Sequence, residues 1–185
     1  MIELAQAVDR SAAQPTKWVA YELVRYHPSA FQAVREDEIE AFAHRVASWY
    51  ATDALGTILA GPLWARGRLP GVLVDRWSRS ENRWLRRLAL VATVGHNAHR
   101  PDAGRTFAVC RALAADRDDM VVKAVSWALR YLSQKERAAV VDFMAECGAQ
   151  FAIRVRREVG TKLATGRKTV ARAGRCAQPA SEPGA

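Results

Sequence analysis

The spacing of apolar and polar positions predicts a chain made of α-helices. Apolar residues recur at helical spacing through most of the sequence, and no segment shows the strict alternation of a half-buried strand. Prolines, glycines and polar clusters separate the apolar segments. The pattern predicts helices over residues 1–8, 17–26, 36–50, 55–63, 72–77, 81–95, 105–115, 119–132, from a capping box at 133–136 to 147, and 150–164.

A weak internal repeat predicts how these helices stack. The segment WLRRLAL at 84–90 resembles VVKAVSW at 121–127, with an offset of 36 to 37 residues, and 154–159 is a poorer third copy. A period near 40 residues is typical of HEAT-type helical hairpins, which stack into a solenoid. We therefore expect an all-α fold, an α-solenoid of HEAT-like helical hairpin repeats with a concave basic face.

The domain organisation follows from composition along the chain. Residues 1–166, closed by Gly166, are predicted to form one domain, and a chain of 185 residues is long enough for one real core. Residues 167–185 are small, polar and basic, with cations at Arg167, Lys168, Arg172 and Arg175. We expect this tail to be disordered and to add nonspecific contacts with DNA.

Asp53 is the most unusual position in the pattern. If the helix 36–50 is extended at about 100° per residue, Phe42, Val46, Trp49 and Asp53 fall on the same side as Ile39. An unpaired carboxylate in an apolar setting is costly. Either the helix breaks before Asp53, or Asp53 faces a functional surface.

Three cations cluster on the helix predicted at 81–95. Arg83, Arg86 and Arg87 share the side opposite its apolar face. Guanidinium groups gathered on one face suit phosphate contacts. A solvated helix face explains such a cluster equally well.

An indole lies on the polar side of the helix predicted at 119–132. Trp127 falls there with Lys123 and Arg130, away from the apolar stripe. A tryptophan flanked by cations can be a platform for a sugar or base. Packing on a neighbouring repeat is the competing interpretation.

Composition adds a partner and a compartment to this picture. The net charge of +9 and a pI near 10.1 favour a polyanionic partner: DNA, RNA or an anionic membrane surface. The first residues predict no signal peptide, and the apolar run 54–65 is too short to span a bilayer. The three cysteines form no zinc or redox pattern, which fits reduced thiols in the cytoplasm.

The chain offers little for other chemistries. His96 and His99 are three residues apart in a predicted loop, without an acidic or cysteine partner at ligand spacing, so no metal site is expected. The sequence has no phosphate-cradling glycine loop and no nucleophile elbow. No cofactor is therefore predicted.

Three segments together resemble the bacterial DNA alkylation repair family, the AlkD-like DNA glycosylases built from HEAT-like repeats. They are SWYATD at 48–53, similar to the family's Trp-x-x-x-Asp, NRWLRRLAL at 82–90, and KAVSWALR at 123–130. Their order and separations match the family, and the resemblance runs over residues 18–168. Relative to that family the chain looks short at its N-terminus, where such proteins carry helices that help to grip DNA.

The resemblance implies roles for individual residues. Asp53, Trp49 and Trp127 correspond to the family's catalytic-cleft residues, and Arg87 to its cleft arginine. The neighbouring cations would then hold duplex DNA through its phosphates: Arg86, Arg83, Lys123 and Arg130. The implied activity is excision of cationic alkylpurines, 3-methyladenine and 7-methylguanine, by a monomeric glycosylase near the nucleoid.

The residues themselves are compatible with that activity and with others. A cationic purine is already a good leaving group, so one carboxylate that stabilises an oxocarbenium-like sugar is sufficient chemistry. A non-catalytic HEAT-like module that binds nucleic acid or protein is the alternative, and it requires only the repeats and the charge. An RNA- or membrane-surface binder has only the charge in its favour.

Overall fold

The computed structural model describes residues 1–169, and within them no strand occurs. The remaining residues, including Arg172 and Arg175 of the predicted tail, lie outside the described part. The elements are α1 (Ile2–Ser11), η1 (Gln14–Thr16), α2 (Trp18–Tyr26), α3 (Pro28–Ala33), α4 (Glu36–Ala43), α5 (Trp49–Ala54), η2 (Leu55–Ala60), α6 (Gly61–Ala65), α7 (Gly71–Ser78), α8 (Arg83–His99), α9 (Ala103–Ala112), α10 (Asp119–Leu132), α11 (Arg137–Cys147), η3 (Gly148–Gln150) and α12 (Ile153–Thr165).

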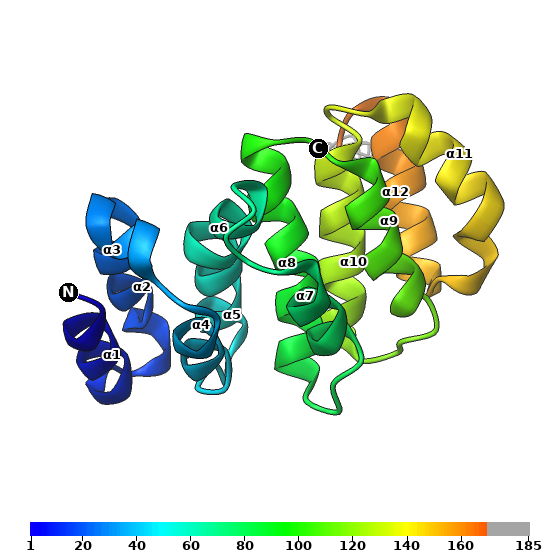
Figure 1. Ribbon diagram of the computed structural model, residues 1–185. Helices are drawn as coiled ribbons and strands as arrows, with labels where there is room; N and C mark the ends of the chain where they lie inside the picture. The colour runs from blue at the N-terminus through cyan, green and yellow to red at the C-terminus, as the bar shows by residue number, and fades with distance from the viewer. Residues whose placement is uncertain (170–185) are drawn as a thin grey trace, which may run out of the picture.

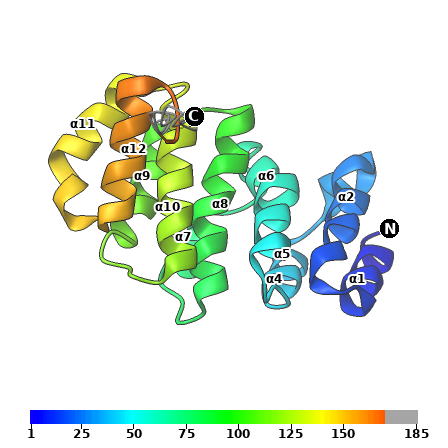
Figure 2. The same cartoon turned by 180° about the vertical axis from the view of Figure 1, so that it is seen from behind.

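The helices stack as antiparallel pairs in the order of the chain (Figure 1). Seen from behind, the helices α2, α5–α6, α8, α10 and α12 lie side by side and run in the same direction (Figure 2). We call this set the parallel row. The short helices α4, α7, α9 and α11 cover its other side. This confirms the predicted all-α solenoid of HEAT-like repeats.

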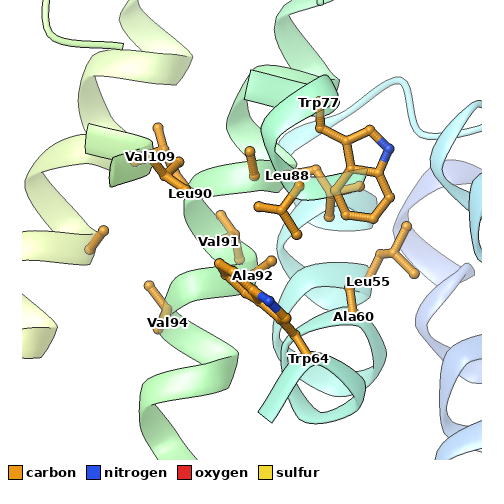
Figure 3. Close-up of a cluster of buried hydrophobic side chains, with 14 of the residues drawn as sticks. Leu55, Ala60, Trp64, Trp77, Leu88, Leu90, Val91, Ala92, Val94 and Val109 are labelled. Carbon is orange, nitrogen blue, oxygen red and sulfur yellow. The ribbon is translucent and has the colours of Figure 1, made fainter. Parts of the chain in front are cut away.

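The core lies between the parallel row and the covering helices. Figure 3 shows part of it, where Leu55 of η2 and Trp64 of α6 lie in one cluster with Trp77, Leu88 and Val91. Each of these side chains is at most 5% exposed. Burying large aliphatic and aromatic side chains contributes about 1.5–3 kcal/mol each. The apolar stripes of neighbouring repeats therefore hold the solenoid together.

Glycines allow two of the core helices to touch at backbone distance. A Cβ on Gly95 of α8 would lie 2.5 Å from the carbonyl oxygen of Gly56, and one on Gly61 would lie 2.6 Å from the Gly95 backbone. Gly56 belongs to η2, a π-helical segment that begins two residues after Asp53. Such segments are wider than an α-helix and often occur near functional sites. The contact therefore holds η2 and α6, which continue the chain after Asp53, against α8, the helix that carries Arg87.

Gly95→Ala is expected to lower the free energy of unfolding by about 1–3 kcal/mol, because the added methyl group forces the two helix backbones apart. Denaturant unfolding measures the change. Gly160→Ala is the matched control, since Gly160 of α12 is exposed and has open space around its Cβ. That variant should be stabilised by roughly 0.5–1 kcal/mol through helix propensity. Equal effects at both positions would contradict the close-contact explanation.

Several predicted helix boundaries are wrong. The helix expected at 36–50 ends at Ala43, and the helix expected at 55–63 continues to Ala65. The loop expected after 95 is helical as far as His99. The helix expected from residue 81 begins at Arg83, where the side chain of Asn82 caps it, and Ser133 ends α10 where a capping box was expected. Helix α3 was missed, because its six residues are too few for periodicity to reveal.

Candidate functional site

The chain breaks just before the segment that carries Trp49 and Asp53. Ser48 is extended, and its hydroxyl accepts a hydrogen bond from the Ala51 amide at 3.3 Å, which starts α5. The side chain of Gln14 holds the break by accepting from the Ala47 amide at 2.9 Å and donating to the Arg45 carbonyl at 3.1 Å. Trp49 and Asp53 therefore do not continue the buried stripe of α4. They lie on the first turns of a new helix with its own direction.

Asp53 forms a bidentate ion pair with Arg87 of α8. Nε of Arg87 donates to Oδ1 of Asp53 at 2.8 Å, and Nη2 donates to Oδ2 at 2.7 Å. Nη1 donates to the main-chain carbonyl of Met120, in the first turn of α10, at 2.5 Å. A bidentate guanidinium fixes both the position and the plane of a carboxylate. One arginine thus connects three members of the parallel row: α5, α8 and α10.

This ion pair lines a pocket of about 340 Å³. Trp49, Met120 and Lys123 complete its lining. Arg87 is buried at 6% exposure, whereas the indole of Trp49 is 44% exposed. Trp49 also stacks on Tyr50, with ring centroids 3.5 Å apart and planes at 26°. A flat aromatic surface therefore stands beside a carboxylate of fixed orientation.

The charge state of Asp53 depends on two opposing effects. Burial raises the pKa of the Asp53 carboxyl, because a charge is costly away from water. The hydrogen bonds and positive charge of Arg87 act against this, and the pKa remains raised. The carboxyl is thus easier to protonate than an exposed aspartate.

Trp127 lies one helical turn beyond Lys123 on α10. Its indole is partly buried and packs against the core. It is not among the side chains that line the pocket around Asp53. The structure therefore places Trp127 in contact with the hydrophobic core, and its catalytic role stays a prediction.

The predicted DNA-contacting cations have carboxylate partners within the protein. Arg86 is bound by Asp116 at 2.7 Å and by two main-chain carbonyls, and Arg130 lies 3.8 Å from Glu158 and donates to Ser126. Both side chains are mostly buried, and the donors named here bind groups within the protein. Their role as DNA contacts stays a prediction. Arg83 and Lys123 pair with Asp118 and Asp119 but remain 53% and 41% exposed.

Sequence reasoning missed three contributors to this site. The Met120 carbonyl has no signal in the sequence, since any residue could supply it. Gln14 acts from more than thirty residues away on the loop before α5. Tyr50 lies inside the segment 48–53, and its adjacency to Trp49 was the available signal.

Within residues 1–169, no three His, Cys, Asp or Glu side chains gather closely enough to hold a metal ion. His96 is buried on α8 against Trp64, with ring centroids 5.1 Å apart. None of the helices in this part of the chain is long and apolar enough to cross a membrane.

The fold and pocket define a class: an α-solenoid whose repeats present a carboxylate, an arginine and an exposed indole at one place. A family model described as DNA alkylation repair enzyme matches residues 1–163. The chain belongs to this family, which gives it an enzymatic role in the repair of alkylated DNA and DNA as its partner. No curated protein matches the sequence.

Proposed function

We propose that the protein is a DNA glycosylase that removes cationic alkylpurines from duplex DNA by hydrolysis of the N-glycosidic bond. The observation that carries this proposal is the Asp53 carboxylate, held in a pocket by Arg87 and flanked by the exposed Trp49 indole. The substrates are 3-methyladenine and 7-methylguanine nucleotides, whose positive charge suits an anionic and aromatic pocket.

The chemistry needs no acid, because the leaving base is already cationic. The bond between the base nitrogen and C1′ breaks, its electron pair neutralises the purine, and positive charge develops on the deoxyribose. Asp53 stabilises that charge and orients a water molecule that adds to C1′. The water loses its proton to Asp53 or to solvent, leaving an abasic sugar and a neutral base. Trp49 packs against the sugar during this step.

The remaining residues position the reactants. Arg87 has its donors committed to Asp53 and Met120, so we assign it to holding the carboxylate and not to binding phosphate. Lys123, which lines the pocket and is partly exposed, binds a backbone phosphate, and Arg83 extends the contact along the strand. Trp127 packs against the core and so helps to hold α10, the helix that carries Lys123, in position.

The test of this proposal is release of free base. Methylated duplex DNA is incubated with the protein, and 7-methylguanine and 3-methyladenine are measured by chromatography. A parallel duplex carries hypoxanthine, a neutral purine lesion of similar size. We expect release of the cationic bases and no release of hypoxanthine. Base release no faster than in a protein-free sample would overturn the proposal, and equal release of both lesion types would overturn the charge-based mechanism.

As the pH decreases, the rate of base release is expected to fall at a higher pH than it would if the catalytic group were an ordinary exposed aspartate. Only ionised Asp53 can stabilise the sugar cation, and burial raises the pKa of its carboxyl, so the active form disappears earlier as the pH decreases. Single-turnover rates between about pH 4 and 8 measure this, after subtraction of spontaneous depurination. Rates that stay constant down to the usual aspartate range would contradict it.

A binding module without catalysis is the alternative that one observation favours. The Arg87 guanidinium neutralises the formal charge of Asp53. An aspartate that stabilises a sugar cation electrostatically needs part of that negative charge. A protein that binds methylated duplex DNA without releasing base would establish this alternative.

A further inference from the structure

A second group of cations lies at the C-terminal ends of three neighbouring helices of the parallel row. Arg25 is in the last turn of α2, Arg66 directly follows α6, and His99 is the last residue of α8. Because these helices run in the same direction in the parallel row, their C-terminal ends lie at the same side of the row (Figure 2). Asp53 and Arg87 are near the other ends.

Arg25 and Arg66 converge on one aromatic ring. Their guanidinium carbons lie 4.7 and 4.9 Å from the centroid of Phe31, a buried side chain of α3. Considering residues 1–169, neither guanidinium has a carboxylate oxygen within 4.0 Å. Arg83, Arg86, Arg87 and Lys123, by contrast, all have one. A pocket of about 350 Å³ opens between them, lined by Arg25, Tyr26, Pro28, Phe31, Gln32 and Arg66.

The helix dipole explains why each helix has a cation near its C-terminal end. It does not explain why the guanidinium groups of Arg25 and Arg66 lie over the same ring. A cation near a helix C-terminus is favourable by itself. Two guanidiniums at one ring repel each other, however, and that arrangement becomes favourable when an anion lies between them. Partial burial, and then the charges of Arg25 and Arg66, lower the pKa of His99, which places this imidazole in the same positive field.

We propose that Arg25 and Arg66, arranged on Phe31, form a phosphate-binding site that takes a backbone phosphate of the DNA. The choice of DNA as ligand rests on the proposed function. Along α8, Arg87 and His99 are separated by a rise of about 18 Å. One duplex would contact the pocket and this site through different backbone phosphates.

The test measures binding of a short undamaged duplex over a range of salt concentrations. The variant is Arg25→Gln/Arg66→Gln. The matched control is Arg35→Gln/Arg79→Gln, which removes the same charge from two exposed arginines that pair with Asp37 and Asp75. We expect the slope of log affinity against log salt to become shallower than that of the control by about 0.9 for each phosphate that the protein no longer neutralises. Equal slopes for the variant and the control would overturn the proposal.

A second variant separates charge from folding. Arg25→Lys/Arg66→Lys retains both positive charges and should retain the wild-type slope, whereas a slope as shallow as that of the glutamine variant would contradict a phosphate contact. The excision assay gives an independent answer. A wild-type protein that releases no base, together with a changed slope in the glutamine variant, would overturn the glycosylase proposal and support this site.

Discussion

Asp53→Asn is expected to reduce base release from methylated duplex DNA by about 10²–10³-fold, the usual consequence of removing a group that stabilises transition-state charge. Asparagine keeps the shape of the side chain but not its negative charge. Affinity for undamaged duplex should be unchanged, because Asp53 makes no phosphate contact. Single-turnover base release and a binding titration on the same preparations measure the two effects.

Asp53→Asn also breaks the ion pair with Arg87, so a second variant is needed to separate stability from catalysis. In Asp53→Asn the buried Arg87 loses its carboxylate, and breaking a buried pair from one side typically costs about 3–5 kcal/mol. Arg87→Met in the same chain removes the uncompensated charge. The double variant should regain most of the stability of the wild type and none of its activity.

Recovery of activity in the double variant would contradict a chemical role for Asp53. In that case the carboxylate would act only by keeping Arg87 and the repeats in place. Arg87→Met alone completes the cycle. It should lower base release less than Asp53→Asn does, because the carboxylate remains but loses its fixed orientation.

Asp9→Asn is expected to lower the free energy of unfolding by about 3–5 kcal/mol. Asp9 is fully buried and is the acceptor for Lys17 at 3.1 Å and for Arg45. The hydroxyl of Tyr21 lies 3.4 Å from the same carboxylate. Removing the charge leaves Lys17, which is 4% exposed, without an anion. Denaturant titration measures the decrease.

Asp37→Asn is the control for Asp9. Asp37 pairs with Arg35 at 3.1 Å, and both side chains are about two-thirds exposed. An exposed ion pair contributes about 1 kcal/mol or less. If the two variants are destabilised equally, burial is not the reason for the importance of Asp9.

The amino-acid sequence determined the fold class and the residues of interest. Helical periodicity is a local property, and it predicted most of the helices and the solenoid from segments of ten to fifteen residues. The helix α3, which it missed, has six residues. It also singled out Trp49 and Asp53, because a carboxylate in register with an apolar stripe is visible without a structure.

Periodicity could not determine where that stripe ends. Periodicity predicted one helix from 36 to 50. In the structure the helix ends at Ala43, Gln14 binds the segment that follows, and Ser48 caps the start of the next helix. Periodicity also did not predict the π-helical segment after Asp53 or the contact between Gly56 and Gly95. Each of these depends on atoms brought together from different repeats.

Charge pairing was decided by tertiary structure for the same reason. On a helical wheel Arg83, Arg86 and Arg87 form one cationic cluster, yet they pair with Asp118, Asp116 and Asp53, residues 30 to 35 positions away in either direction. The sequence determined that a carboxylate and guanidiniums are present. Stacking one repeat on the next decided which of them meet, because a contact between repeats depends on how their helices are offset and not on spacing within either one.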